Sequence, residues 1–401
     1  MDPLRKMAVD ITIATSAEVV DSIDDLLIQI LLRLPLKSLI RCKLVSRHWR
    51  SLITSPLFYF LLHPDTHPLG LVYPGRKGST FGYINLDVKK PFTPPFRELR
   101  FPGEPFPFWI QQSCNGLLLC CSSGDYDYRR SRYPIRRCYI YNPTTDSFSK
   151  LPRPGVVNDV PRIVLGANLA FDQAKFPHYK VVCVRGSEYG CDLLQIEIYS
   201  AESDLWRVSG KPFSDEASFD YGVYWNGSIH WVNYLHKKLL YFNVDKESFG
   251  KMPLPARLHG PMGVGYFGES CNRLHIIERN VTKIAFNVYE IKRDYSECFV
   301  KYHVDLSIVA AAFPDMTYMD TVINRTCYAF SVFYLIRSEE EDSFLVLQIS
   351  RKAIRFSLDF NTFEEISDLE DNYVAEPWLV RGTAESCLPR AFEHIKSLVG
   401  V

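Results

Sequence analysis

The chain has 401 residues, and its 46 Lys and Arg balance its 46 Asp and Glu, so the formal net charge at pH 7 is zero. A balanced charge gives no global attraction to nucleic acid or to an anionic membrane surface, and we expect neither as a partner. With 47% hydrophobic residues the chain can hold one large domain plus a small one. No run approaches the roughly 18 apolar residues of a membrane-spanning helix.

The eleven cysteines are scattered without regular spacing, and their number is odd. This pattern predicts reduced thiols in a protein of the cytoplasm and/or nucleus, because a disulfide framework uses paired, regularly spaced cysteines. Residues 1–20 include Asp10 and Glu18 and have no continuous apolar core. We therefore expect a disordered N-terminal tail, not a signal peptide.

The segment Ser22–Phe60 has helical periodicity. A first helix is predicted to begin at a capping box of Ser22 and Asp25 and to end before Pro35. Its apolar residues recur at helical spacing and predict one broad apolar face: Leu26, Leu27, Ile30, Leu31 and Leu34.

Two further short helices are predicted in the same segment. The second carries Leu39, Ile40, Leu44 and Val45, and the third begins at Ser46 as N-cap and stops at Ser55-Pro56. Three such short helices make a marginal core, so a partner is needed. Each Leu or Ile left in water forgoes roughly 1.5–3 kcal/mol.

The residues of this segment carry a family resemblance. LLRLPLKSL over 31–39 and RCKLVSRHWRSLI over 41–53 closely resemble the F-box of plant F-box proteins, whose pattern is LLRLP-x-KSL followed by C-V-[CS]-K-x-W-x-x-L-I. The family usually opens with Leu-Pro before an acidic residue, and that pair normally packs against a Skp-type adaptor. Ser22-Ile23-Asp24-Asp25 here keeps the acid and lacks the Leu-Pro pair.

The resemblance implies an F-box over residues 21–64 that docks on a Skp-type adaptor bound to a cullin scaffold. The apolar positions of the segment are the candidates for that contact or for the core that supports it. They are Leu26, Ile30, Leu34, Pro35, Leu39, Val45 and Trp49.

After a polar break at His63–Pro68 the pattern changes from helix to strand. Two strands, within Leu71–Tyr73 and Phe81–Leu86, are followed by the Pro-rich stretch Lys90–Phe108. The aromatic residues of that stretch predict packed coil and not a flexible linker.

A unit of four short strands then recurs five times. The third copy is the clearest, with the hairpin dipeptide Asn226-Gly227 between two strands, and the fifth spans about Thr317–Ile366. Such units are typical of propeller blades, which stack around an axis to bury their faces. A sixth is expected from the Leu71–Leu86 hairpin and the segment Tyr373–Leu388.

The predicted fold is therefore an α+β multidomain chain, with a small N-terminal three-helix F-box followed by an all-β propeller of about six four-stranded blades. The propeller is assigned to residues 69–390, and 391–401 to a C-terminal tail. Repeat segments such as SCNGLL, YNPTTD and GVYWNGSIHW resemble the plant F-box-associated, kelch-related interaction domain over residues 70–390. This resemblance implies a domain that binds a partner protein, without saying which.

No motif for catalysis or cofactor binding is present. The sequence lacks a C-x-x-C pair, H-E-x-x-H, G-x-S-x-G, a P-loop and G-x-G-x-x-G, so no cofactor or metal is expected. The adjacent Cys120 and Cys121 are predicted to face opposite sides of a strand.

His230 and His275 occupy equivalent positions in successive units and are interpreted as hydrogen-bonded blade histidines, with a metal or catalytic role as the alternative. Aromatic residues at regular spacing are interpreted as inter-blade core, with sugar stacking as the alternative: Trp206, Trp225, Trp231 and Tyr224.

One predicted loop, Ser122–Arg137, is longer than a hairpin requires and alternates Tyr with Arg. Tyr and Arg dominate interface hot spots, and the local charge suits an acidic or phosphorylated partner segment. A solvated loop is the alternative, and nothing elsewhere in the chain extends the patch toward nucleic-acid binding. The substrate-binding candidates are Tyr126, Tyr128, Arg129, Arg130, Arg132 and Tyr133.

These features together predict a non-catalytic substrate-recognition subunit of a Skp-cullin-F-box (SCF) ubiquitin ligase. The F-box would bind the adaptor, and the propeller would bind the protein to be ubiquitinated. Two alternatives remain from the sequence: an F-box scaffold without ligase function, and a glycan-binding propeller.

Overall fold

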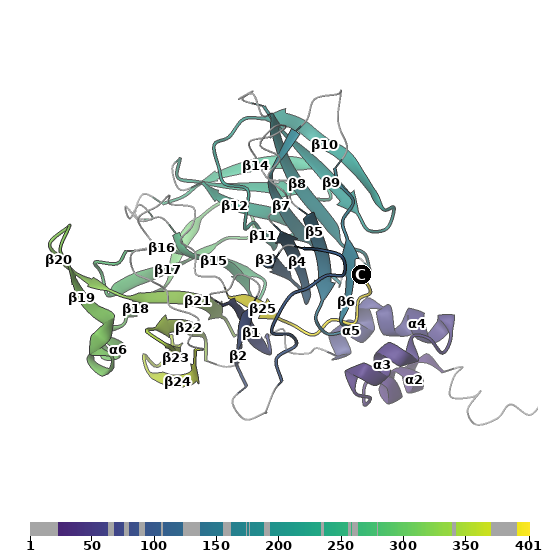
Figure 1. Cartoon of the computed structure of the whole chain (residues 1–401), viewed down its shortest axis with the longest axis horizontal. Helices are drawn as coiled ribbons and strands as arrows, with labels where there is room; N and C mark the ends of the chain where they lie inside the picture. The colour runs from purple at the N-terminus through teal and green to yellow at the C-terminus, as the bar shows by residue number, and fades with distance from the viewer. Residues whose placement is uncertain are drawn as a thin grey trace, which may run out of the picture. The chain divides into compact units, whose positions relative to one another are not determined.

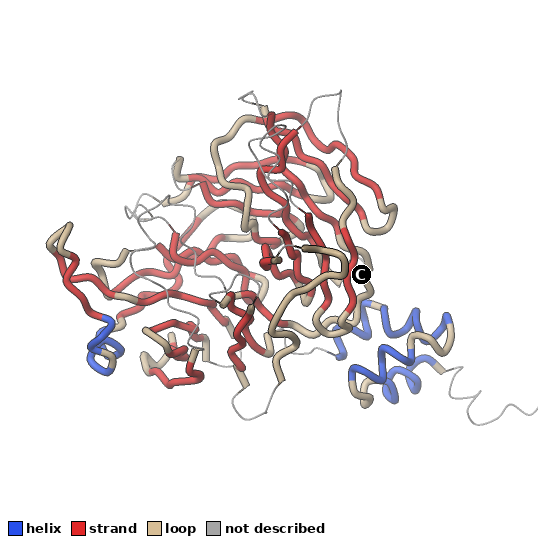
Figure 2. The backbone as a smooth tube through the Cα atoms, in the orientation of Figure 1, coloured by secondary structure: helices blue, strands red, loops and turns tan. Residues whose placement is uncertain are grey.

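The computed structural model divides the chain into two compact units, Met1–Asp65 and Thr66–Val401. The first is helical, and strands dominate the second (Figures 1 and 2). The structure describes residues 23–62, 68–75, 80–87, 93–105, 107–122, 137–154, 162–173, 175, 177–187, 193–233, 236–255, 258, 264–278, 280–338, 342–369 and 391–401. The expected tail over 1–20 lies outside these residues.

Four helices form the described part of the N-terminal unit. They are α2 (Asp24–Leu31), α3 (Leu36–Cys42), α4 (Arg47–Thr54) and α5 (Pro56–Leu62). Each contributes at least one fully buried side chain to a small core that contains Leu27, Leu31, Leu39, Ile53 and Phe58. The core is small because the helices are short, in agreement with the marginal stability expected from the sequence.

The helix α5 is a correction to the predicted three helices. Pro56 ends α4 and is also the first residue of α5, where a missing N–H costs nothing. Ser55 serves both helices: its Oγ donates to the Leu52 carbonyl at 2.7 Å and accepts from the Phe58 N–H at 3.2 Å. The same Ser-Pro pair therefore stops one helix and caps the next.

Other helix limits differ in detail. The N-cap of α2 is Ile23, which makes no side-chain cap, and the predicted cap residue Ser22 lies outside the described residues. The helix α3 ends at Cys42, so Leu44 and Val45 belong to the turn before α4 and not to the second helix. The predicted cap at Ser46 is confirmed, because its Oγ accepts the Trp49 N–H at 3.1 Å.

The described part of the second unit contains six antiparallel blade sheets and one further two-stranded sheet, which confirms the propeller (Figure 1). Five have four described strands each, and the sixth, β2-β1-β25, has three. The strands of the first three four-stranded blades are β3 (Phe108–Cys114), β4 (Leu117–Ser122), β5 (Arg137–Asn142), β6 (Ser147–Lys150); β7 (Arg162–Ala170), β8 (Lys180–Ser187), β9 (Leu194–Ser200), β10 (Leu205–Phe213); and β11 (Val223–Trp225), β12 (Ser228–Asn233), β13 (Lys238–Asn243), β14 (Ser248–Pro253). The next two are β15 (Val264–Ser270), β16 (Arg273–Glu278), β17 (Ala285–Ile291), β18 (Cys298–Asp305); and β21 (Phe330–Ile336), β22 (Phe344–Ile349), β23 (Lys352–Ser357), β24 (Phe363–Asp368).

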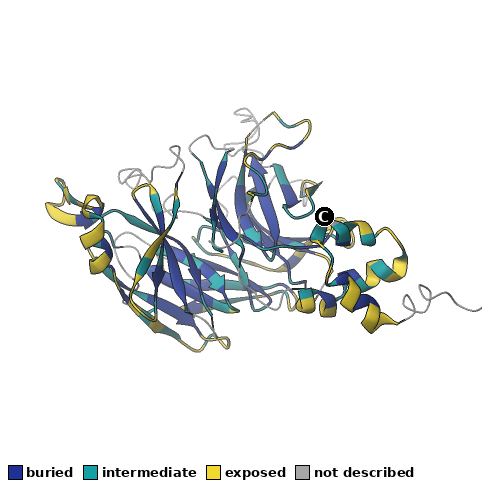
Figure 3. Ribbon diagram, turned by 90° about the horizontal axis from the view of Figure 1, so that it is seen from below, coloured by how far each residue is buried: buried dark blue, intermediate teal, exposed yellow. Residues whose placement is uncertain are grey.

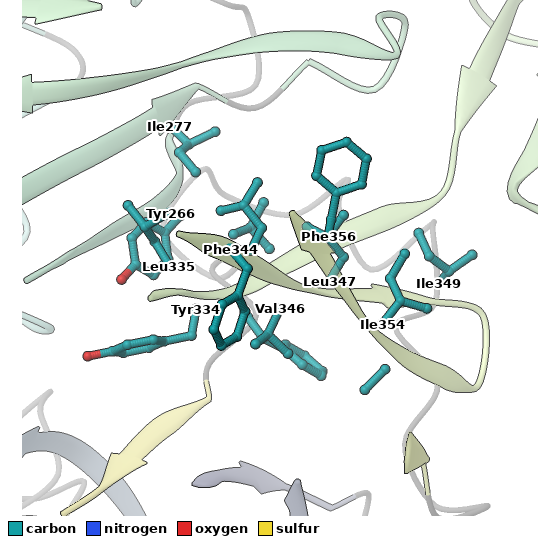
Figure 4. Close-up of a cluster of buried hydrophobic side chains, with 14 of the residues drawn as sticks. Tyr266, Ile277, Tyr334, Leu335, Phe344, Val346, Leu347, Ile349, Ile354 and Phe356 are labelled. Carbon is teal, nitrogen blue, oxygen red and sulfur yellow. The ribbon is translucent and has the colours of Figure 1, made fainter. Parts of the chain in front are cut away.

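The first strand of each four-stranded blade is the innermost one. Toward the middle of the unit, each inner strand contacts the inner strand of the next blade. The order of these contacts is β25 (Phe392–His394), β3, β7, β11, β15 and β21. Apolar side chains fill the space between neighbouring blades, as Figure 4 shows around β21–β23. The hairpin predicted at Asn226-Gly227 is confirmed, because both residues have positive φ between the paired strands β11 and β12.

The ring is closed by both ends of the propeller sequence. β1 (Gly70–Pro74) pairs with β2 (Phe81–Asn85) on one side and with β25 on the other. The assignment of 391–401 to a tail is therefore wrong, because β25 belongs to the sixth sheet and Ser397, Leu398 and Val399 are buried. The segment Tyr373–Leu388, where the closing strand was expected, lies outside the described residues.

The fifth repeat is shorter than predicted. Its sheet begins at Phe330, and an insertion precedes it after β18. The insertion consists of α6 (Ser307–Ala312), a 3-10 turn at Pro314–Met316, and the two-stranded sheet of β19 (Thr317–Asp320) and β20 (Arg325–Tyr328). The alternating pattern of a hairpin is the same inside and outside a blade, so the sequence alone does not separate Thr317–Tyr328 from the blade that follows.

The Pro-rich stretch before β3 is packed coil where it is described. Phe101 is buried and stacks on Tyr139 of β5, with ring centroids 4.2 Å apart. Glu104 accepts hydrogen bonds from Tyr139 at 2.7 Å and from Lys150 at 2.7 Å, and it pairs with Arg137. These cations and the phenol lower the pKa of Glu104 to about 2, so the carboxylate ties the coil to the blade.

Candidate interaction surfaces

Apolar side chains remain in solvent on the N-terminal unit, and Figure 3 shows its helices with exposed residues. Leu26 is 44% exposed and Ile30 45% exposed, and because they lie four positions apart on α2 they share one side of the helix. Ile23, before the helix, is 41% exposed. The buried residues Leu27, Ile28 and Leu31 occupy the other side, so the single apolar face predicted for this helix is divided between core and surface.

The remaining adaptor candidates divide in the same way. Val45 and Pro35 are exposed, Leu34 and Trp49 are partly buried, and Leu39 is completely buried. Leu39 therefore belongs to the supporting core and does not reach the surface. Leu44, which was not among the candidates, is 85% exposed, more than any other large apolar side chain described in residues 23–62.

Polar contacts hold α4 in place beside this surface. His48 of α4 lies 3.1 Å from Asp24 in the first turn of α2, measured from Nε2 to Oδ1. Lys43 lies in the turn before α4, where burial and the charge of Arg50 lower the pKa of its ammonium group to about 8. The turn that presents Leu44 and Val45 thus precedes a helix that Ser46 caps and whose His48 contacts Asp24 of α2.

The substrate-binding residues predicted from the sequence are not in the described part of the chain. All six fall between the end of β4 and the start of β5: Tyr126, Tyr128, Arg129, Arg130, Arg132 and Tyr133. Their role stays a prediction.

The two blade histidines are buried, in β12 and β16. His230 is hydrogen-bonded to the Val223 carbonyl at 3.2 Å and to the Tyr295 hydroxyl at 3.0 Å, and burial lowers its pKa to about 3. His275 lies 3.5 Å from Glu290, and burial lowers its pKa as well. In the described part of the chain no group of three or more His, Cys, Asp or Glu side chains is arranged to hold a metal ion.

The regularly spaced aromatic residues are core residues, as interpreted. Trp225 and Trp231 are buried in apolar clusters between blades, and the partly buried Trp206 and Tyr224 pack against a neighbouring cluster around Leu169. Cys120 and Cys121 belong to different clusters, which confirms that they face opposite sides of β4.

A cavity of about 130 Å³ lies where the inner strands meet. It is lined by residues of β3, β11, β15, β21 and β25 and by their flanking turns. Two carboxyl groups belong to it, Glu269 of β15 and Glu393 of β25. Sequence reasoning missed this site because the two acids lie in different repeats, far apart in the sequence, and neither is part of a recognisable motif.

Comparison with known families agrees with this architecture. Residues 24–61 match the F-box domain, and residues 83–294, just over half of the chain, match the F-box associated beta propeller domain. F-box protein At5g07610 of Arabidopsis thaliana is 33% identical over 414 aligned residues, which cover 97% of this chain and 94% of that protein. The chain belongs to the F-box proteins with an F-box-associated propeller.

Other relatives belong to the same group. F-box/LRR-repeat/kelch-repeat protein At2g27520 and F-box/kelch-repeat protein At3g23880, both of Arabidopsis thaliana, are 27% and 24% identical, over 58% and 57% of this chain and 60% and 64% of those proteins. Among solved structures, TolB from Acinetobacter baumannii aligns with a TM-score of 0.39 at 9% identity, over 80% of this chain and 70% of that one.

The F-box of such a chain implies a Skp-type adaptor as partner, and the propeller implies a substrate-recognition surface. Within the described residues no helix has the length and apolar character needed to cross a membrane.

Proposed function

We propose that this F-box protein is the substrate-recognition subunit of an SCF-type ubiquitin ligase. Its N-terminal helices bind a Skp-type adaptor and, through it, a cullin scaffold. Its propeller binds the protein to be ubiquitinated. The observation that supports this most strongly is the exposed apolar surface of Leu26, Ile30 and Val45 on a unit that matches the F-box domain.

The free energy of burying that surface favours complex formation. A fully buried Leu or Ile gains roughly 1.5–3 kcal/mol relative to an exposed one. Leu26 and Ile30 have more than two fifths of their surface in water, and Leu44 has most of its surface in water. A partner that covers these residues supplies the burial that the short helices cannot supply alone.

In this proposal the chain makes and breaks no bonds. The propeller holds a substrate protein near the ubiquitin-conjugating enzyme that the cullin scaffold brings, which raises the effective concentration of the reacting groups. We also propose that the protein acts in the cytoplasm and/or nucleus. The odd number of irregularly spaced cysteines in the sequence supports such a reducing environment.

The test is co-purification of the full chain with a Skp-type adaptor and a cullin from plant cells. Leu26→Asp with Ile30→Asp places two charges on the exposed side of α2 and is expected to abolish recovery of both partners. Both side chains are exposed, so the helices should still fold, which circular dichroism of the variant checks.

The matched control is Val322→Asp with Phe360→Asp, two apolar side chains that are 68% and 73% exposed on the propeller unit. It is expected to retain both partners. Recovery of the adaptor without the cullin would support a scaffold without ligase function and would overturn the proposal. Failure to recover the adaptor with the unsubstituted chain would overturn it too.

A further inference from the structure

Two cysteines lie opposite each other on neighbouring strands of the first four-stranded blade. Cys121 of β4 and Cys138 of β5 are register partners, and their Sγ atoms are 2.8 Å apart. Both are free thiols in the structure. Two sulfur atoms at this separation need little further movement to reach the roughly 2.05 Å of a disulfide bond.

The main-chain geometry of the two strands also suits a disulfide. The Cys138 carbonyl accepts the N–H of Leu151, which directly follows β6, at 2.9 Å. In an antiparallel strand the N–H and C=O of one residue point to the same side, so the main-chain groups of Cys138 point away from β4. Cys121 and Cys138 therefore form a non-hydrogen-bonded pair, in which the Cα atoms are about 4.5 Å apart. This separation lies within the roughly 4.4–6.8 Å that disulfides span.

A cavity of about 250 Å³ between the first two four-stranded blades gives a small molecule access to this pair. Cys138 belongs to its lining and is partly exposed, whereas Cys121 is completely buried, so Cys138 is the thiol that a reagent meets first. Glu104 pairs with two basic residues of the lining, and the third leaves the site with a net positive charge that suits an anionic reagent. The described lining contains no Asp or Glu, and its basic residues are Arg137, Lys150 and Arg153.

We infer that Cys121 and Cys138 are a reversible oxidation site, at which the two thiols form a disulfide by exchange with a small disulfide of the glutathione class. The Cys138 thiolate attacks one sulfur of the reagent, which forms a mixed disulfide and releases one glutathione thiolate. The Cys121 thiolate then attacks the Cys138 sulfur, and the second glutathione thiolate leaves. Two protein thiols are oxidised, one glutathione disulfide is reduced, and the two protons pass to the leaving thiolates.

This inference agrees with a protein whose other cysteines stay reduced. In reducing compartments the disulfides that do form are usually transient and redox-sensing. The exchange concerns the propeller alone, so it does not depend on the proposed binding of an adaptor.

The experiment treats the purified full chain with oxidised glutathione under native conditions. The remaining thiols are then alkylated, and the peptides are mapped by mass spectrometry without reduction. A Cys121–Cys138 disulfide is expected as the main product, and excess reduced glutathione should restore both thiols. Absence of this disulfide would overturn the inference, and so would a disulfide between Cys138 and Cys183, a second cysteine that lines the same cavity.

Cys121→Ser separates the two steps of the exchange. Without the second thiol nothing resolves the mixed disulfide, so Cys138 is expected to retain one glutathione. Cys138→Ser should leave Cys121 unmodified, because Cys121 is completely buried. Glutathione on Cys121 in the second variant, or none on Cys138 in the first, would overturn the proposed exchange.

Cys183→Ala and Cys120→Ala are the matched controls. Cys183 lines the same cavity, and Cys120 is adjacent to Cys121 but packs in a different apolar cluster. Both variants are expected to form the Cys121–Cys138 disulfide as the unsubstituted chain does, and circular dichroism before oxidation checks that each is folded. Loss of the disulfide in a folded control would overturn the assignment to this pair.

Discussion

Glu269, one of the two glutamates that line the cavity between the inner strands, couples the stability of the propeller to pH. Glu269 holds its proton up to about pH 8 in the folded chain, whereas a Glu in the unfolded chain releases it near pH 4.3. Between these values the folded state binds more protons than the unfolded state does. The contribution is fully present below the unfolded pKa and is lost as the pH rises through the folded pKa, so stability falls with rising pH.

Glu269→Gln is predicted to remove this dependence. Between about pH 5 and about pH 9 the free energy of unfolding of the natural chain should fall relative to that of the variant, by on the order of 4 kcal/mol. Urea denaturation at a series of pH values measures the difference. Glu202→Gln, at an exposed position, serves as the control, and parallel pH profiles for the natural chain and Glu269→Gln would contradict the assignment of a raised pKa.

At the scale of elements, Ser55 connects two helices through one side chain. Its Oγ accepts the Phe58 N–H at the start of α5 while it donates to the Leu52 carbonyl at the end of α4. Because Phe58 is completely buried, the position of α5 matters for the small core of the unit.

Ser55→Ala is predicted to destabilise the N-terminal unit by about 0.5–2 kcal/mol, the usual cost of losing an N-cap. Hydrogen exchange of the α5 amides measures the effect, with faster exchange expected in the variant. Ser51→Ala, at an exposed position inside α4, is the control and is expected to change little. Equal protection in both variants would mean that Ser55 does not cap α5.

Local patterns predicted the elements that repeat or that begin with a side-chain cap. The helix cap at Ser46 and the hairpin turn at Asn226-Gly227 were predictable, since a cap and a two-residue turn depend on nearby residues only. Pro56 was interpreted only as a stop signal, although the same residue type is favoured at the first position of a helix. Leu26 and Leu27 are adjacent in sequence, and their division between surface and core depends on the other helices.

At the scale of the whole molecule, ring closure depends on contacts between the two ends of the propeller sequence. β25 pairs with β1, and the residues after it lie against the blade of β3–β6, where Asn142 Nδ2 donates to the carbonyls of Ser397 and Val399 at 3.0 and 2.7 Å. Leu398 and Val399 are 3% and 5% exposed. The sequence predicts closure by a C-terminal segment but not by Phe392–His394, because a three-residue strand has too few residues to show periodicity.

Truncation after His394 is predicted to destabilise the propeller by about 3–6 kcal/mol, the burial of two aliphatic side chains. Thermal unfolding followed by circular dichroism should show a lower transition temperature. Truncation after Val399, which removes only Gly400 and Val401, is the control and should cost much less. An unchanged transition in the longer truncation would show that the C-terminal residues do not stabilise the ring.

Both units together would serve the proposed function, in which an exposed apolar surface on the F-box joins a substrate-binding propeller to a ligase. Its most direct test is the affinity of the purified chain for a purified Skp-type adaptor, measured by isothermal titration calorimetry. We expect a one-to-one complex that Leu26→Asp with Ile30→Asp weakens by at least about a hundredfold, since two buried apolar contacts become unpaired charges. An unsubstituted chain that shows no binding, or a variant that binds equally well, would contradict it.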